Sequence, residues 1–440
     1  MRQLCEDHSD HRCLEGRQEL GSLLEHRLFR TGRHFKWRSD VKRRQFIAGA
    51  IAAMASLAWG CNRKGDYTAI VSDDRVDDTA RLQTALNRGG HITLDKGRRY
   101  RLSAPAGARA ALVIHSDTFL DLAGATIELV PGQRCALIST MRGEHSRNIR
   151  IAGGEVVGNG VLQPLGFDQP PNFDPGIGLT PTFYLMNCDG LKLYDLRMHD
   201  TYQYAVYARG NDGTMDNLSV EGAIGGGVHI TGARWQIDRV TVRNVTYFDP
   251  VNCTGNPFIV NLRDSTVGSI QCENYGFGVK FQDGCENVTV NSILAVGGDN
   301  NVQDYLVKIQ GMKDKRGTAL NRGIRIGSIV ARNGPSSGLY IIYSDGVDIG
   351  SYQGENNGRS PHEDAANDAD VLVIDSDHLH FGTLRVKGYR RHGLWIHDTV
   401  GQFSADTVEI EDAKEIDAVP MVLRSGSVVI GGKRIRIFVP

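Results

Sequence analysis

The most constraining feature of the sequence is a short strand-like pattern that recurs from about residue 115 onward. Segments such as YAVYARGN, FIVNLRDS, GVKFQDGC and YLVKIQGM alternate apolar with polar residues over three to five positions and end in Gly, Asn or Asp. Alternation with a period of two is typical of β-strands, and the terminal residues favour turns. A chain that repeats this unit so often is expected to stack its strands in one extended sheet structure.

The spacing of these segments predicts a solenoid. In each segment one side chain is expected to point away from the core, namely Tyr207, His229, Asn261, Lys280, Lys308, Tyr340, Val373 and Trp395. Successive members are 19 to 33 residues apart, which fits one coil of a solenoid with or without an inserted loop. Further short strands, such as RVTVRNV and IRIGSIV, lie between them. Three strands per coil over about ten to twelve coils define an all-β fold, the parallel β-helix.

Turn residues and one helix support this interpretation. Gly accounts for 52 of 440 residues, about 12%, whereas the usual fraction is ~7%. Asparagines fall at similar places in successive coils, where a left-handed backbone conformation is needed at a corner: Asn244, Asn274, Asn333 and Asn357. The segment 77–90, DDTARLQTALNRGG, has an Asp N-cap, an apolar face and glycine after its end. It predicts a short helix that covers the first coil.

The helix, the strand pair HITLDKGRRYRL and the coils together resemble the pectin-lyase-like superfamily of right-handed parallel β-helices. The similarity is greatest to its polygalacturonase-like and pectate-lyase-like branches and covers roughly residues 68–440. The resemblance implies a right-handed solenoid that acts on polysaccharides. The superfamily includes lyases, hydrolases, epimerases, esterases and proteins with no known reaction, so the resemblance leaves the reaction open.

The outward side chains predict a polar groove on one sheet. Stacked strands lie ~4.8 Å apart, so five coil steps span roughly 25–30 Å, the length of an extended oligosaccharide. The side chains expected along this strip are Arg209, His229, Asn261, Arg263, Lys280, Gln282, Lys308, Gln310 and Tyr340, with Tyr207 at its edge. The formal net charge is only −1, which gives no indication of nucleic acid binding. Basic groups gathered on one face suit an acidic polysaccharide, since Arg pairs with carboxylates bidentately. The alternative is a solvated outer face without a ligand.

Insertions are expected to form the walls of the groove. The longest are residues 158–181, 246–257 and 297–304. Asp249, Asp299 and Asp304 all precede strands of the same sheet, so they are candidate Ca²⁺ ligands, with Asp249 also a candidate substrate contact. Ca²⁺ prefers oxygen ligands of this kind. The same aspartates are equally good turn formers.

Three functions fit the groove. The central outward positions hold no Asp or Glu before Asp375, which favours β-elimination over hydrolysis by paired carboxylates. Lys280 or Lys308 would then be the base, Arg263 would neutralise the uronate carboxylate, and His229 or Tyr340 would assist proton transfer. A hydrolase would depend on Asp249, Asp283 and Asp304, and YFDPVN at 247–252 partly matches a motif of alginate epimerases. The third function is polymer binding without catalysis, as in exopolysaccharide assembly.

The N-terminal region predicts export. Residues 41–61, VKRRQFIAGAIAAMASLAWGC, join a charged segment to an apolar run that is short for a membrane span of ~20 residues. RRQFI resembles a twin-arginine signal, which implies a periplasmic, membrane-anchored or extracellular protein. Cys61 ends an imperfect lipoprotein box, so lipidation at Cys61, cleavage nearby and an uncleaved anchor all stay open. Residues 1–40 fit no export signal and are expected to be a non-native or disordered extension, with Val41 as a candidate start. Residues 62–440 are predicted to be one β-helix domain, and a monomer.

Overall fold

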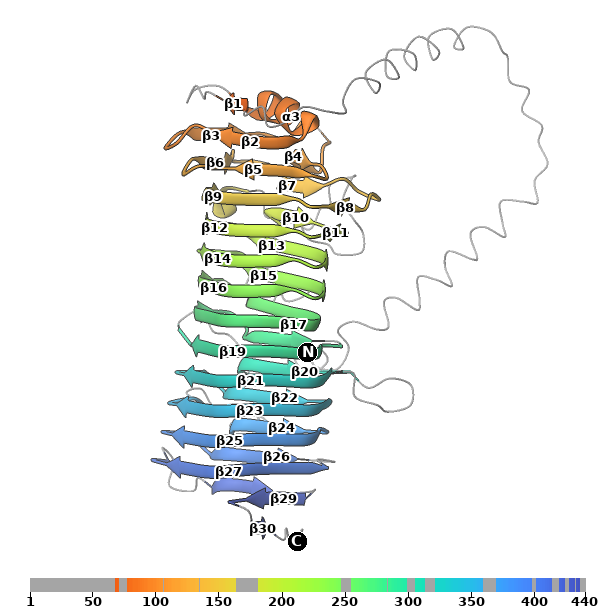
Figure 1. Cartoon of the computed structure of the whole chain (residues 1–440). Coiled ribbons are helices and arrows are strands. Elements are labelled where there is room, and N and C mark those ends of the chain that lie inside the picture. Colours follow the sequence, from red (N-terminus) through yellow and green to blue (C-terminus); the bar gives the residue numbers. More distant parts are fainter. Residues whose placement is uncertain are drawn as a thin grey trace, which may run out of the picture. The chain divides into compact units, whose positions relative to one another are not determined.

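The computed structural model describes residues 68–70, 77–105, 107–133, 135–163, 181–246, 255–282, 284–298, 305–312, 321–358, 369–397, 401–413, 419–423, 427–431 and 433–435. Over these residues the chain is a right-handed parallel β-helix, as the sequence predicts. Its coils follow one another from α3 at one end to β30 at the other (Figure 1). The coils form three strand stacks, which we call A, B and C in chain order.

Stack A begins with β1 (Thr68–Ile70), β2 (Gly90–Leu94) and β5 (Thr118–Asp121). Stack B begins with β3 (Arg99–Leu102) and β6 (Thr126–Leu129). Later strands run through A and then B without a break: β9 (Arg150–Val157), β12 (Lys192–His199), β14 (Thr214–Glu221), β16 (Gln236–Val245), β19 (Glu286–Val296), β21 (Asn321–Arg332), β23 (Ser344–Glu355), β25 (Asp377–Lys387) and β27 (Gln402–Glu411). In stack A, β27 pairs with β29 (Ser427–Ile430), which pairs with β30 (Lys433–Ile435) in the antiparallel sense.

Stack C carries the predicted groove. Its strands are β4 (Ala110–Ile114), β7 (Ala136–Thr140), β10 (Phe183–Leu185), β13 (Tyr202–Asn211), β15 (Ile224–Ala233), the first part of β17 (Asn256–Tyr275), β18 (Val279–Gln282), β20 (Tyr305–Gln310), β22 (Ser337–Ile342), β24 (Ala369–Ile374), β26 (His392–His397) and β28 (Val419–Leu423). Strand β17 continues from C into A and B. A separate two-stranded sheet pairs β8 (Ser146–Arg147) with β11 (Cys188–Asp189), and η1 (Gly160–Leu162) follows β9.

Alternation along the strands separates core from surface. In β18 the side chains of Val279 and Phe281 are fully buried. The alternate residues, Lys280 and Gln282, are half-buried on the outer face. The inward residues of all three stacks form one continuous apolar core from Leu82 to Val428. Apolar burial on this scale is the main stabilising contribution to a solenoid, because each coil covers its neighbour.

The corners after stack B confirm most of the asparagine prediction. Asn244, Asn274 and Asn333 have positive φ, and the Asn274 amide donates to Asn244 Oδ1 at 2.7 Å. In the next coil the prediction was one residue off, because Asn356 has the positive φ of 55°. Asn357 instead points inward and donates to Ala331 O at 3.0 Å. A corner needs one left-handed residue, and the sequence offers two adjacent asparagines here.

Helix α3 (Thr79–Arg88) lies where the sequence predicts it and buries Leu82, Ala85 and Leu86. Its N-cap is Asp78, whose side chain makes no capping hydrogen bond; the preceding Asp77 instead accepts at Oδ1 from the Thr79 N–H at 2.9 Å. No helix among the described residues is long and apolar enough to cross a membrane. The predicted export signal and Cys61 lie outside the described residues.

Candidate functional site

Strand register places five predicted residues in one row on the outer face of stack C. Tyr207 pairs with His229, Lys280 with Lys308, and Lys308 with Tyr340. We call this line of residues, which also contains Ile259, the lysine row. Ile259 stands between His229 and Lys280, in the place that the sequence analysis gave to Asn261.

A second, parallel row lies two residues further along each strand. Its members are Arg209, Thr231, Asn261, Gln282 and Gln310, and we call it the polar row. The predicted position of Asn261 was therefore wrong by two residues, and Arg263 lies beyond both rows, opposite Ala233. A slip of two residues keeps a side chain on the same face, so the periodicity of the sequence could not detect it.

The lysine row becomes apolar past Tyr340. Tyr340 pairs with Leu372, which pairs with Trp395. The prediction that Val373 points outward was wrong, because Val373 is fully buried in the core. Leu372 and Trp395 instead form a small apolar cluster on the outer face with Ala369, against which Tyr340 packs. The polar part of the row thus ends at Tyr340.

Lys308 lies between two aromatic rings. Its Nζ is 4.7 Å from the ring centroid of Tyr305 and 4.8 Å from that of Tyr340. Contact with aromatic faces favours the ammonium over the neutral amine. Lys308 is therefore better suited to attract an anion than to accept a proton.

His229 is more buried than a groove residue was expected to be, with 9% of its surface exposed. Its ring packs against Tyr207 and Tyr204, at centroid distances of 4.5 and 5.7 Å. Burial, with a smaller effect of Lys280, lowers the pKa of His229 to about 4, so the imidazole is neutral near pH 7. Its Nε2 is 3.5 Å from Thr231 Oγ1, while the buried Nδ1 has no hydrogen-bond partner among the described residues.

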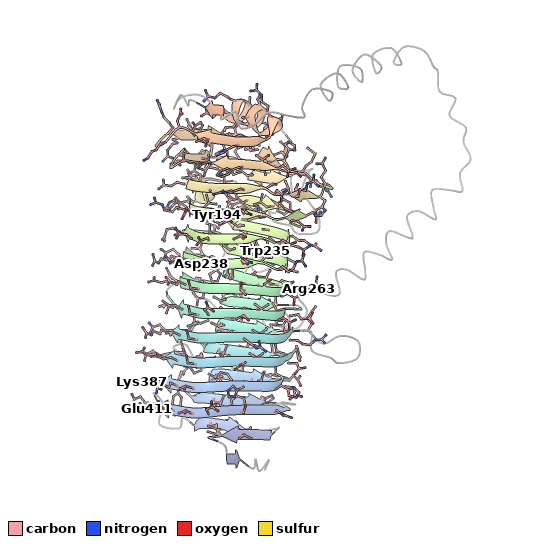
Figure 2. All side chains as sticks on the ribbon, in the orientation of Figure 1. Tyr194, Trp235, Asp238, Arg263, Lys387 and Glu411 are labelled. Atoms are coloured by element: carbon pink, nitrogen blue, oxygen red, sulfur yellow. The ribbon has the colours of Figure 1, made fainter. Side chains whose placement is uncertain are left out.

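A cleft of about 700 Å³ opens where stack C turns into stack A. Three predicted residues line it, Arg209, Asn261 and Arg263, together with Thr231 of the polar row. The arginines are both exposed, and Figure 2 shows Arg263 at the edge of the coils. The cleft therefore brings residues of the polar row together with Arg263, which lies outside that row.

Glycines leave the floor of the cleft bare. Gly210 and Gly232 pair on neighbouring strands, and a Cβ added to Gly232 would collide with the carbonyl oxygen of Gly210. The fully buried Trp235 supports them from inside, since its Nε1–H donates to Gly210 O at 2.8 Å. The backbone can thus approach a ligand closely here.

The acidic and imidazole groups of the cleft were not predicted from the sequence. Glu144, His145 and Asp189 line it together with the arginines. His145 Nε2 is 3.0 Å from Asp189 Oδ2. These residues lie in or beside the short β8 and β11 strands, outside the periodic pattern, and no signal in the alternation marks them.

The Ca²⁺ hypothesis concerns residues that the structure does not describe. Asp249, Asp299 and Asp304 lie outside the described residues, as does Asp283. In the part of the chain that the structure describes, no three His, Cys, Asp or Glu side chains come together as metal ligands.

No family model and no curated protein matches the chain. Among solved structures, the tailspike of the E. coli bacteriophage HK620, in complex with a pentasaccharide, is 11% identical, with a TM-score of 0.51 over 84% of this chain and 77% of the tailspike. PfbA, a surface adhesin of Streptococcus pneumoniae, is 14% identical, with a TM-score of 0.50 over 80% of this chain and 91% of PfbA. The A-module of the Azotobacter vinelandii mannuronan C-5 epimerase AlgE4 is 16% identical and covers 83% of this chain and 99% of the module, with a TM-score of only 0.44. The tailspike and PfbA alignments support the parallel β-helix fold and nothing further.

Proposed function

We propose that the outer face of stack C binds an acidic polysaccharide and that the protein cleaves it by β-elimination at uronic acid residues. The observation that carries the proposal is the register: Lys280 and Lys308 stand on consecutive strands of one row. The polar row runs beside them and reaches a cleft that holds Arg209 and Arg263.

This arrangement suits an extended anionic chain. Lys280 and Lys308 place two cations about 4.8 Å apart on neighbouring strands, while Tyr207 and Tyr340 at the two ends of the row are half-buried and present ring surface. Arginine pairs with a carboxylate through two parallel hydrogen bonds, which fixes a uronate more tightly than a lysine does. The tailspike of similar fold was solved with a pentasaccharide, so a solenoid of this kind can hold a saccharide.

Elimination needs a base and a neutralised carboxylate. The base removes the proton at C5, next to the carboxylate, the electron pair forms the C4=C5 double bond, and the C4–O bond breaks. The leaving oxygen takes a proton, so the products are an unsaturated uronate and a shortened chain. Lys280 is the better base of the two lysines, because the rings around Lys308 favour its ammonium form. The neutral His229 and Tyr340 lie in the same row and would assist proton transfer.

Hydrolysis is the second candidate function. Glu144 and Asp189 line the same cleft, and paired carboxylates cleave glycosidic bonds by acid–base catalysis. Epimerisation shares the first step of elimination, since it also removes the C5 proton. Binding without turnover needs only the cations and the tyrosines.

One experiment separates these functions. The purified protein is incubated with polygalacturonate, alginate and glucuronate-containing polymers, and ultraviolet absorbance and reducing ends are followed. Elimination produces both signals and hydrolysis only the second. Retention without either signal means an epimerase where proton NMR shows an inverted C5 configuration, and a binding protein where the polymer is unchanged. A protein that neither binds nor changes any acidic polymer overturns the proposal.

We also propose that the protein is exported through the twin-arginine route, with Cys61 as the site of lipid attachment. The support is RRQFI and the apolar run before Cys61. Mass spectrometry of the mature N-terminus tests it: a lipidated Cys61 supports the anchor, while an N-terminus at Met1 or Val41 contradicts processing.

A further inference from the structure

The cleft contains a histidine–aspartate pair. His145 Nε2 lies 3.0 Å from Asp189 Oδ2, and 68% of the His145 side chain is exposed. An ionised carboxylate only accepts hydrogen bonds, so a neutral imidazole in this pair carries its hydrogen on Nε2. The lone pair is then on Nδ1, the nitrogen that is available to a ligand in the cleft.

Asp189 is itself held in place. Its Oδ1 accepts from the Asn211 backbone N–H at 2.7 Å, and the Asn211 side chain accepts from the Ala233 N–H at 3.1 Å. Pairing of β11 with β8 fixes the backbone of Asp189 as well. A carboxylate that is fixed in this way sets the tautomer and orientation of the histidine and stabilises the imidazolium that forms when it accepts a proton.

The pair shares its cleft with the two arginines. Arg209 and Arg263 line the same cleft of about 700 Å³ as His145 and Asp189. Lys280, by contrast, does not line this cleft, and its partner in register is Ile259, four residues before Arg263 on β17. A uronate whose carboxylate is bound by the arginines is therefore better placed for a base on the cleft wall.

We propose that His145, oriented by Asp189, is the general base that removes the proton next to the carboxylate of a uronic acid residue bound by Arg209 and Arg263. This inference rests on the proposed function. His145 Nδ1 takes the C5 proton, the electron pair forms the C4=C5 bond, and the C4–O bond breaks. The imidazolium, stabilised by Asp189, then gives its proton to the departing oxygen, which returns the dyad to its starting state.

The test compares wild type with His145→Gln and Asp189→Asn. A matched control is His378→Gln, because His378 also forms an exposed pair with an aspartate, Asp345, at 2.8 Å but lies outside this cleft. We expect His145→Gln to lower kcat by about 10²–10⁴-fold, with KM and the melting temperature nearly unchanged. We expect Asp189→Asn to lower kcat less, and the acid limb of the pH profile to disappear in His145→Gln. His378→Gln should match wild type in kcat and KM.

The outcomes separate the inference from the proposed function. If wild type produces no unsaturated product from any acidic polymer, the elimination proposal fails, and the role of His145 fails with it. If wild type is active and His145→Gln is equally active, only the role of His145 is overturned. An inactive Lys280→Ala beside an active His145→Gln would assign the base to Lys280.

Discussion

A charge placed at Val279 should unfold the coils, whereas the same charge at Lys280 should not. Val279 is fully buried in the stack, and Lys280, the next residue, is half-buried on the outer face. Val279→Asp loses about 1.5–3 kcal/mol of apolar burial and adds several kcal/mol for an unpaired buried carboxylate. The total, about 5 kcal/mol or more, is comparable with the whole stability of many domains, roughly 5–15 kcal/mol.

Circular dichroism, limited proteolysis and chemical denaturation measure this difference. We expect Val279→Asp to be insoluble or protease-sensitive and Lys280→Asp to unfold close to the wild-type midpoint. The two variants add the same side chain at neighbouring positions, so a difference between them reports only which face each residue occupies. A stable Val279→Asp together with an unfolded Lys280→Asp would mean that the inward and outward faces are interchanged.

Three further predictions concern the described residues. Burial lowers the pKa of His229 to about 4. The contribution of His229 to folding stability is therefore complete above the unfolded-state pKa of ~6.5 and falls by on the order of 3 kcal/mol as pH drops toward 4. His229→Gln should flatten this loss in melting curves, and an unchanged pH dependence would contradict the prediction. Gly232→Ala should lower the melting temperature and weaken oligosaccharide binding, because a Cβ would collide with Gly210 O; wild-type values for both would argue against a rigid cleft floor. The hydrogen bond to Asp345 raises the pKa of His378. The pair therefore stabilises the fold below pH ~6.5, and less as pH rises through the folded-state pKa. In an NMR titration the pKa of His378 should be lower in Asp345→Asn than in wild type, and an unchanged pKa would refute the pairing.

The sequence predicted the parts of the fold that follow from periodicity. Alternation in segments such as GVKFQDGC identified the strands and correctly assigned Val279 and Phe281 to the core and Lys280 to the surface. The helix at 79–88 followed from its apolar face and its flanking residues. These features are local, and each is repeated or strongly patterned, so one sequence is enough to read them.

The pairing register of the strands and the residues that line the cleft were harder to predict from the sequence. The predicted row position of Asn261 was wrong by two residues, which keeps its side chain on the outer face. The predicted position of Val373 was wrong by one residue, which moves its side chain from the outer face to the core. Both positions depend on how each coil closes onto the previous one. His145 and Asp189 meet across two short strands that are 44 residues apart in the chain. Only the closed coils bring such residues together, and neither lies in a periodic segment.

The central claim is that an acidic polymer lies along the lysine row of stack C, and a matched pair of double variants tests it most directly. Lys280→Ala/Lys308→Ala removes two cations from that row, while Lys192→Ala/Arg325→Ala removes two exposed cations from the outer face of stack A. At about 1.5 kcal/mol for each charge-assisted contact, the first variant should bind an acidic oligosaccharide about a hundredfold more weakly in calorimetry. The stack A variant, which changes net charge equally, should bind nearly as well as wild type. Equal losses in both, or none in the first, would contradict binding along stack C.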